Sequence, residues 1–511
     1  MERKETRLQG VEWTAYRNLR LKKQVRYVTI KRIDGGEKMN NSQNKNLLTE
    51  GSIWKKLMGF AFPLFLGNLF QQLYNTADSL IVGNFLGSDA LAAVSSSGSL
   101  TFLLVGFFQG LAMGAGVIIA RYFGARQKKE LHRAIHTTVA FGILCGILLT
   151  AGGVVLAPKI LILMKTPADI LPKSTLYFQV YAMGSLGLVL YNNFVGIMQA
   201  VGDSRHPLYY LIFSSLLNVA LDMVFVGGLG MGVEGAALAT IISQFMSAFL
   251  CLYRLMKKNP EEYTVSLRDV RLDSYMLKQI VSNGLPAGIQ NSVIAIANVV
   301  VQSNINSFGK LAVAGCGAYS KVEGFGFLPI TCFSMGLTTF ISQNLGAKKY
   351  DRAKKGARIG ILCSISMAEI VGIIVYFASP VFIAAFNNDP KVIAFGVKEA
   401  HIITLFYFLL AFSHCIAGLM RGAGRATVPM FVMLGCWCVI RVTYITIAVK
   451  LHPVIQTVFW AYPLTWSLSS ILFLICCTSN IRQNVWHTSR LIRLHPDTCL
   501  NILCIICCSK V

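Results

Sequence analysis

The chain has 511 residues, of which 54% are hydrophobic and 14% are charged, and its formal net charge is +24. Hydrophobic runs long enough to cross a bilayer recur from Leu57 to Cys477, so the composition predicts an all-α polytopic membrane protein embedded in the lipid bilayer. Much of the basic charge lies in short loops between these runs, where it orients the spans. Nucleic-acid binding is therefore excluded.

Residues 1–52 are predicted to form a basic cytosolic tail, because the first part of the chain is strongly basic and lacks the apolar core of a signal peptide. A sharper hypothesis is that translation starts at Met39, since Gly35–Lys38 must be encoded by a purine-rich stretch compatible with a bacterial ribosome-binding site. Residues 478–511 form a second basic tail that contains cysteines. Its single CxxC, Cys504 to Cys507, has no second pair and no nearby histidine cluster, so no metal site is expected there.

From Leu57 onward the hydrophobic runs predict about twelve spans. They are expected at residues 57–83, 93–120, 134–157, 174–200, 207–229, 233–256, 279–305, 314–342, 358–378, 399–420, 428–449 and 457–477. The first six spans would form an N-lobe (53–256) and the last six a C-lobe (279–477), joined by a cytosolic linker (257–278).

The loop charges indicate how the spans are oriented. Basic residues gather after spans two, six and eight, whereas the loops after spans one and five have none and the loop after span seven has only Lys310. Because loops rich in Lys and Arg stay in the cytoplasm, both termini are predicted to be cytoplasmic. The expected location is the cell (plasma) membrane.

The two halves of the chain repeat each other at a spacing of 222 positions. The matched pairs are Gly87 and Gly309, Gly124 and Gly346, Pro158 and Pro380, Gly202 and Gly424, and Pro207 and Pro429. Six spans is an even number, so the two six-helix bundles share one orientation and are related by a pseudo-two-fold axis along the membrane normal. Parallel repeats of this kind are typical of transporters that alternate access by rocking one half against the other.

A carboxylate inside the first span is the first candidate for function. Asp78 sits in an apolar run, where a charge costs roughly 2.5–3.5 kcal/mol, so it is expected to face a protein interior or a cavity and to bind something. Span five adds Asn218 and Asp222, which are four residues apart and share a helix face, and span six adds Thr240. These oxygen ligands suit sodium, and the carboxylates can alternatively carry protons.

In the repeat, Asp78 and Asp222 fall opposite Val300 and Tyr444, so the acidic site is expected in the N-lobe alone. Pro63 weakens the helix backbone before Asp78 and is the candidate hinge. Polar residues expected to line a central cavity are Gln71, Gln72, Asn75, Gln290, Asn291 and Asn298.

Further charged residues lie within the C-lobe spans, and three of them are singled out here. Lys321 and Glu323 are expected to form a local ion pair. Arg441 is expected either to snorkel to the membrane surface or to neutralise a neighbour.

Several motifs together resemble the multidrug and toxic compound extrusion (MATE) family, and the resemblance runs from Ile53 to Cys477. They are QQLYNTAD (Gln71–Asp78), GLAMG (Gly110–Gly114), FGA (Phe123–Ala125), QAVGD (Gln199–Asp203) and GVEGAALAT (Gly232–Thr240). The resemblance implies two six-helix bundles around a central cavity and cation-coupled antiport of drugs and metabolites.

The resemblance also implies roles for individual residues. Asp78 resembles the aspartate of the family's first helix and Pro63 its proline, while Asn218, Asp222 and Thr240 resemble the rest of the first-lobe cation site of the archaeal and DinF-like branch. Another branch carries acidic residues in spans seven and ten. Here span seven has Gln290 and Asn291, and no Asp or Glu occurs within residues 402–420, so no cation site is expected in the second lobe.

The expected function is therefore secondary active multidrug efflux, in which cationic or amphipathic drugs or metabolites are exchanged for protons or sodium. No nucleotide-binding GxxxxGK[ST] loop occurs, so the coupling ion would drive export, with no other cofactor, in a monomer. The alternative is a flippase for lipid-linked oligosaccharides from the same superfamily, for which several Arg or Lys residues would be expected in the cavity. An enzyme is not expected, because the eight His residues are scattered.

Overall fold

The computed structural model describes residues 47–164, 166, 169–257 and 263–484. The chain divides into two compact units, Met1–Leu47 and Leu48–Val511, and the first lies almost entirely outside the described residues. The hypotheses on Met39 and on the cysteine pair Cys504 and Cys507 also fall outside them. All that follows concerns the second unit.

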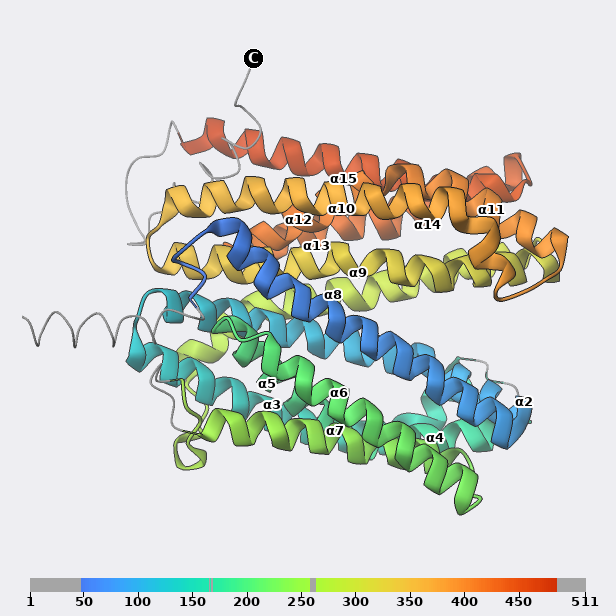
Figure 1. The fold of residues 1–511 in the computed structure, drawn as a ribbon, viewed down its shortest axis with the longest axis horizontal. Coiled ribbons are helices and arrows are strands. Elements are labelled where there is room, and N and C mark those ends of the chain that lie inside the picture. Colours follow the sequence, from blue (N-terminus) through green and yellow to red (C-terminus); the bar gives the residue numbers. More distant parts are fainter. Residues whose placement is uncertain (1–46, 165, 167–168, 258–262, 485–511) are drawn as a thin grey trace, which may run out of the picture. The chain divides into compact units, whose positions relative to one another are not determined.

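Every regular element in the described part of the chain is helical (Figure 1). The predicted N-lobe and linker contain α2 (Ile53–Gly124), α3 (Lys128–Leu163), α4 (Leu171–Met183), α5 (Ser185–Ala200), α6 (Arg205–Asp222), the π-helical turn η1 (Met223–Gly228), α7 (Val233–Met256) and the short 3₁₀ helix η2 (Leu267–Asp269). The predicted C-lobe contains α8 (Ser274–Asn306), α9 (Lys310–Gly346), α10 (Tyr350–Ala384), α11 (Pro390–Ile403), η3 (Thr404–Phe406), α12 (Tyr407–Gly422), α13 (Thr427–Met433), η4 (Leu434–Ile440), α14 (Arg441–Leu451) and α15 (Ile455–Asn484).

The helices confirm the predicted class of fold. Among the described residues, 10 helices are long and apolar enough to cross a membrane, and 11 if α4 and α5, which meet at a bend of 49°, count as one broken span. The remaining predicted span, 57–83, falls in the first part of α2. Spans ten and eleven are each assembled from three consecutive elements, α11–η3–α12 and α13–η4–α14.

The first two predicted spans both lie within α2. Leu48, just before this element, donates its backbone N–H to Gln343 Oε1 at 3.0 Å, and Gly124, at the other end of α2, also packs against Gln343. A straight helix of 72 residues would be roughly 108 Å long. Because both ends meet the same residue, the chain reverses direction within α2, as two separate spans require.

The backbone confirms the repeat of 222 positions. Positive φ angles occur at Arg126 (55°) and Lys348 (57°), which are repeat partners, and again at the partners Gly202 (89°) and Gly424 (82°). A positive φ is uncommon for a residue other than glycine, so its recurrence in register is informative. The same turns therefore follow the corresponding helices in both lobes.

The lobes meet where α2 packs against α8 and α9. Gly110 lies against Gly288, and Gly114 against Gly284, so closely that a Cβ on any of the four would clash with the facing backbone. Glycine is needed here because no side chain fits between the crossing helices. This crossing holds the second half of α2 against α8, and Figure 1 shows α2 between the helices of the two lobes.

The same interface continues to the end of the bundle that carries the basic loops, called the basic end below. There Gly124 lies against the carbonyl of Gln343, and Gly346 lies against the carbonyl of Arg121. Gly124 and Gly346 are repeat partners, and so are Arg121 and Gln343. The pseudo-two-fold axis therefore passes between these contacts, and the lobes are tightly closed at the basic end.

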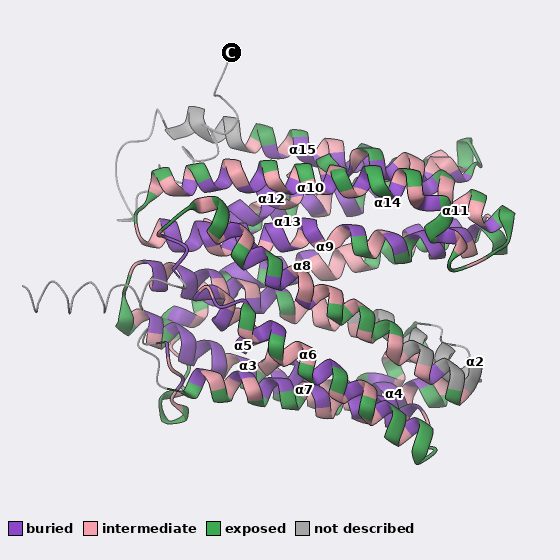
Figure 2. Cartoon of the chain, in the orientation of Figure 1, coloured by how far each residue is buried: buried purple, intermediate pink, exposed green. Residues whose placement is uncertain are grey.

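Burial follows the two lobes rather than a single core. Figure 2 shows buried residues on the helix faces that point into each bundle and exposed residues on the outer faces. Many outer residues are large and apolar, such as Phe377, Val155 and Phe431. Apolar outer surfaces of this extent are expected of helices that face lipid.

Candidate functional site

The N-lobe site is built where α6 ends beside α7. Asn218 and Asp222 lie one turn apart on α6 and Thr240 lies on α7, and all three side chains are buried, with Asp222 at 0% exposure. Asn218 Nδ2 donates to Thr240 Oγ1 at 3.5 Å, and Thr240 donates to the carbonyl of Ala236 at 3.0 Å. The structure therefore brings Asn218 and Thr240 into contact, with Asp222 one turn further along α6.

Directly after Asp222 the helix changes to the π-helical turn η1, Met223–Gly228. Such turns widen a helix locally and occur frequently at functional sites. The sequence analysis did not predict this turn, and only the two glycines at its end, Gly227 and Gly228, could have indicated it.

The structure brings Asp78 of α2 to the same place, close enough for its carboxyl group to interact with that of Asp222. Four oxygen atoms accept no hydrogen bond from the described residues: Asp78 Oδ1, Asn218 Oδ1 and both carboxyl oxygens of Asp222. Buried polar atoms are normally satisfied, so four free acceptors in one place indicate that the site binds a donor or a cation.

Tyrosines surround the two carboxyl groups. Tyr74, one turn before Asp78 on α2, and Tyr177 on α4 both lie near enough to interact with Asp78 and Asp222. Sequence reasoning missed both, because a tyrosine in an apolar run is usually a packing residue. The helical spacing of Tyr74 from Asp78 was a signal that could have found one of them.

No fixed positive charge accompanies these carboxylates. None of the ion pairs between described residues involves Asp78 or Asp222. The sequence has no Lys or Arg from Leu57 to Ala120 or from His206 to Tyr253, the stretches that supply the site. Two buried carboxylates without a countercharge are unfavourable, so the arrangement calls for a bound cation or for protons.

Comparison with known proteins agrees with this architecture. A family model described as MatE matches the chain twice, over residues 63–224 and 286–447. The chain belongs to the MatE family. The two matches correspond to the two halves of the repeat.

The relatives of this MatE chain are transporters. A probable multidrug resistance protein, YoeA of Bacillus subtilis, is 28% identical over 451 residues, which are 87% of this chain and 96% of that protein. A probable multidrug resistance protein, NorM of Thermotoga maritima, is 29% identical over 391 residues, 74% of this chain and 82% of that one. The chain is accordingly a multi-pass membrane transporter and not an enzyme.

A solved structure described as the outward-facing conformation of a multidrug resistance MATE family transporter has the same fold. Its TM-score is 0.80 at 21% identity, and the match covers 86% of this chain and 98% of that one. The likeness supports the two-lobe arrangement of helices predicted from the repeat.

The predicted hinge and three of the predicted cavity residues lie on α2 of this MatE fold. Pro63 is buried inside the helix. Gln71 and Asn75 are exposed, whereas Gln72 reaches toward Gly324 of α9, with its Nε2 3.8 Å from a Cβ placed there. Gln72 thus faces the C-lobe across the space between the lobes.

The other three predicted cavity residues lie on α8 and behave differently from one another. Asn298 is exposed. Asn291 Nδ2 donates to the carbonyl of Gly106 on α2 at 3.0 Å, so it joins the lobes. Gln290 is buried and donates to Met433 Sδ at 2.8 Å, so its side chain packs within the C-lobe.

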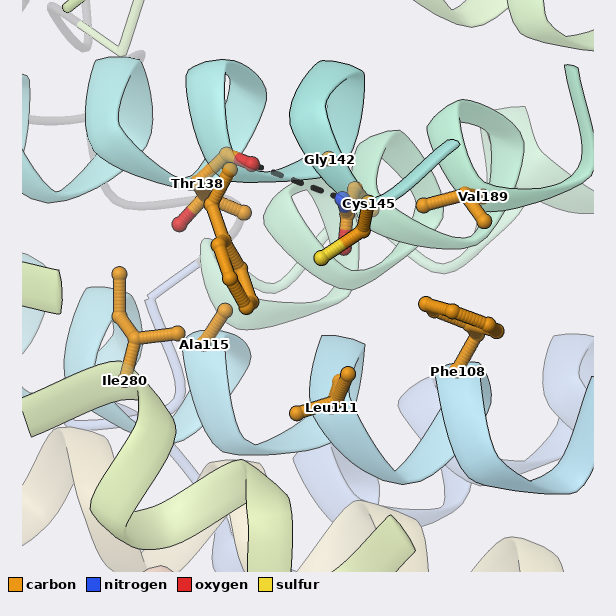
Figure 3. A pocket seen from close by; sticks show the side chains of 10 residues that line it. Phe108, Leu111, Ala115, Thr138, Gly142, Cys145, Val189 and Ile280 are labelled. Carbon is orange, nitrogen blue, oxygen red and sulfur yellow. Dashed lines mark hydrogen bonds between the residues drawn. The ribbon is translucent and has the colours of Figure 1, made fainter. Parts of the chain in front are cut away.

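Figure 3 shows a small cavity in the N-lobe between α2, α3, α5 and α8. Its volume is about 10 Å³, roughly the room that one water molecule needs. Phe108, Leu111 and Val189 make it largely apolar, and Asn193 Nδ2 donates to the carbonyl of Thr138 at 3.5 Å along its edge. None of the predicted site residues borders it, and it is too small for a drug.

In the C-lobe, the expected ion pair between Lys321 and Glu323 is wrong. Lys321 is exposed, Glu323 is turned inward, and the two form no ion pair among the described residues. Arg441 is 3% exposed, so it does not snorkel to the surface, and it lies within electrostatic reach of Glu323. Of its two predicted roles, neutralising a neighbour is the one that this position allows.

Proposed function

We propose that this MatE chain is a secondary active exporter that exchanges cationic or amphipathic compounds for protons or sodium ions by alternating access. The observation that carries the proposal is the pair of carboxyl groups Asp78 and Asp222, which with Asn218 present four free acceptor atoms and have no fixed countercharge among the described residues. A site of this kind is stable only when something positive occupies it.

The exchange of substrate for ion follows because both are attracted by the negative charge of Asp78 and Asp222. When both carboxylates are ionised, the N-lobe attracts a cationic substrate into the space between the lobes. A proton or sodium ion arriving from outside neutralises the site, the first span rearranges about Pro63, and substrate leaves outward. Each charge that crosses the membrane contributes about 2.3 kcal/mol per 100 mV, which supplies the driving force.

The interface between the lobes fits one step of such a cycle. Close contacts at glycines hold the two lobes together from Gly110 to the basic end. With the predicted topology, in which the basic loops are cytoplasmic, this arrangement is shut toward the cytoplasm. We therefore assign it to the outward-directed half of the cycle, in a monomer of the cell membrane.

The test is ethidium efflux from proteoliposomes that contain the purified chain, under separately imposed sodium and proton gradients. Efflux that one gradient drives, and that Asp78→Asn and Asp222→Asn each abolish, would support the proposal and identify the coupling ion. The matched control is Asp351→Asn, an exposed carboxylate on α10, which should transport like the wild type.

Folding is checked by size-exclusion chromatography of each variant in detergent. Failure of well-folded wild-type protein to move any cationic dye under either gradient would overturn the proposal. The lipid-linked oligosaccharide flippase would then be the function to test, with translocation of a fluorescent lipid-linked sugar as the assay.

A further inference from the structure

The residues Leu48–Ser52, called the entry segment below, lead into the first span and are not helical. Leu48 is 2% exposed and Thr49 is 4% exposed, so the first part of the segment is buried. Neither the N-lobe ion site nor the glycine contacts between the lobes account for this burial.

The C-lobe binds the backbone of the entry segment. Arg352 of α10 donates to three backbone carbonyl groups, those of Leu48 (3.1 and 3.2 Å), Glu50 (3.0 Å) and Gly51 (2.6 Å). Lys349 Nζ, directly before α10, donates to the carbonyl oxygen of Thr49 at 3.1 Å. Four consecutive carbonyl groups of a segment that leads into the N-lobe are therefore held by charged donors of the C-lobe.

Gln343 of α9 joins the entry segment to the N-lobe. Its Oε1 accepts from the backbone N–H of Leu48 at 3.0 Å, and its Nε2 donates to the carbonyl oxygen of Ala200, at the end of α5, at 2.7 Å. The side chain is fully buried. Both functional ends of one C-lobe amide are thus occupied, one by the entry segment and the other by the N-lobe.

The carboxyl group of Glu50 makes a second link between the lobes. Its Oε1 lies 3.2 Å from Arg126 Nη2, in the turn between α2 and α3, and 4.0 Å from Lys349 Nζ, in the turn between α9 and α10. These two turns correspond in the repeat, since Arg126 and Lys348 are partners with matching positive φ angles. The negative charge of Glu50 therefore lies between equivalent basic turns of the two lobes.

The linker between the lobes repeats this arrangement. A shift of 222 positions places the entry segment on residues 270–274, which lead into the first span of the C-lobe. There the N–H of Asp273 donates to Thr137 Oγ1 at 3.3 Å, and that of Ser266 donates to His136 Nε2 at 2.9 Å, both on α3 of the N-lobe. Each lobe thus holds the segment that leads into the other lobe.

The first turns of span one continue the attachment to the C-lobe. Leu57, Phe60 and Leu64 belong to one buried cluster with C-lobe residues. A Cβ placed on Gly336 of α9 would lie 3.6 Å from the ring of Phe60. Val82, further along the same span, belongs instead to a cluster of N-lobe residues. Span one is therefore attached to the C-lobe at its start and to the N-lobe beyond its middle.

We propose that the entry segment is a latch that keeps the lobes closed at the basic end. It stays on the C-lobe, and its ion pair with Arg126 breaks when the basic end opens. Charge-assisted hydrogen bonds are about twice as strong as neutral ones, and several of them hold the segment on the C-lobe. The pair of Glu50 with Arg126 is weaker, because the side chain of Arg126 is 67% exposed.

This order of events places the movement within span one. The start of the span remains with the C-lobe while the part that carries Asp78 moves with the N-lobe, and Pro63 lies between them, where the helix backbone lacks a hydrogen bond. The latch rests on the alternating access proposed above, but the closure of the basic end can be measured without any transport.

The experiment is hydrogen–deuterium exchange of the purified full chain in detergent, without drug, read at both ends of α9. Glu50→Gln removes the charge that faces Arg126, so exchange in the C-terminal turns of α2 and α9 should rise about two- to fivefold. Exchange at the opposite end of α9 should not change. The matched control is Asp351→Asn, an exposed carboxylate at the basic end, which should behave like the wild type at both ends.

Two further variants separate a latch from a general loss of stability. Arg352→Gln frees the backbone of the entry segment, so exchange at the basic end should rise more than about tenfold, whereas Lys355→Gln, an exposed residue of the same helix, should leave it unchanged. Glu50→Gln combined with Arg126→Gln should exchange no faster than Glu50→Gln alone, because both substitutions break one ion pair.

An unchanged basic end in Glu50→Gln and Arg352→Gln would overturn the latch, and so would an equal rise at both ends of α9. If the exchange results are as expected but well-folded wild-type protein moves no cationic dye, the antiport is rejected and the latch stands.

Discussion

The two lobes repeat one backbone plan but neutralise their buried carboxyl groups differently. In the N-lobe, Asp78 and Asp222 lie in stretches without Lys or Arg, Leu57 to Ala120 and His206 to Tyr253, and neither forms an ion pair among the described residues. In the C-lobe, Glu323 lies within electrostatic reach of Arg441, which hydrogen bonds and aromatic rings hold in place. The N-lobe therefore needs a cation that binds reversibly, whereas the C-lobe contains a permanent positive charge, the guanidinium of Arg441.

This difference assigns unequal roles to equivalent halves. A site that must recruit its cation changes charge whenever the cation leaves, and such a change can drive a helix to move. A site with a resident guanidinium changes less. We therefore expect the N-lobe to couple transport to the ion gradient and the C-lobe to act as the steadier partner.

The largest expected effect comes from giving the N-lobe a resident cation as well. Asn218→Lys places an ammonium four residues from Asp222 on the same helix face, where a charge pair at about 4 Å is worth roughly 4 kcal/mol at an effective dielectric constant of 20. That energy is close to a thousandfold in affinity, so the lysine should displace the coupling ion and abolish gradient-driven efflux.

The control is Asn218→Met, which has similar length and no charge and should keep part of the efflux. The measurement is ethidium efflux from proteoliposomes under each gradient, together with the melting temperature in detergent. Full efflux by Asn218→Lys would mean that the N-lobe needs no mobile cation. The proposed difference between the lobes would then be wrong.

The next effect comes from removing the resident cation of the C-lobe. Arg441→Gln should lower stability by about 2 kcal/mol, because Glu323 loses its countercharge and Thr465 loses its donors. The loss should be greatest at alkaline pH, where Glu323 is ionised, and should shrink as protonation neutralises it at acidic pH. Melting temperatures across this pH range, with Lys450→Gln for comparison, test it; a loss independent of pH would count against a charge effect.

Much of this fold could be predicted from the sequence, because its signals are local or periodic. Apolar runs gave the spans, and glycines and prolines at a fixed spacing gave the repeat, which Arg126 and Lys348 confirm through their shared backbone turn. The spacing of Asn218 and Asp222 indicated one helix face, and in the structure both are buried residues of α6.

What the sequence could not predict depends on which helices cross. Glu399 looked like an end residue of a span, and only the contact of Gly315 with Gly396 shows that it is enclosed. Similarly, Lys321 is close to Glu323 in the chain but points outward, because residues two apart lie on different faces of a helix. Gln290 looked like a cavity residue, yet it packs against Met433 of α13, and nothing in the sequence indicates that α13 lies beside Gln290.

A smaller effect is expected at the interface, where the lobes are alike. Gly124→Ala and Gly346→Ala each place a methyl group against a facing carbonyl. Each should destabilise the closed arrangement of the lobes at the basic end by about 1–3 kcal/mol. Because the two glycines are repeat partners with mirrored contacts, the two variants should have similar effects. Gly59→Ala is the control on the same helix as Gly124, since nothing lies within 4 Å of its added Cβ.

The separation of the lobes at the basic end can be measured by hydrogen–deuterium exchange in the C-terminal turns of α2 and α9. In both glycine variants the rate of hydrogen–deuterium exchange should rise about tenfold for each 1.4 kcal/mol by which the closed state is destabilised. In Gly59→Ala the rate should stay unchanged. Faster exchange in only one of the two would show that the interface, and not only the ion sites, distinguishes the lobes.

The smallest expected effect separates the two candidate ions of the N-lobe. Thr240→Val keeps the shape of the side chain but removes the hydroxyl oxygen that accepts from Asn218, a loss of about 1 kcal/mol. If sodium is the coupling ion, the hydroxyl is one of its ligands, and the sodium concentration for half-maximal efflux should rise about fivefold. If protons are the coupling ion, they bind to Asp78 and Asp222 themselves, so the pH dependence of efflux should hardly move. Thr240→Ser, which keeps the oxygen, should match the wild type in both assays, and a defect in Thr240→Ser as large as that in Thr240→Val would trace the effect to packing against Ala236 rather than to the ion.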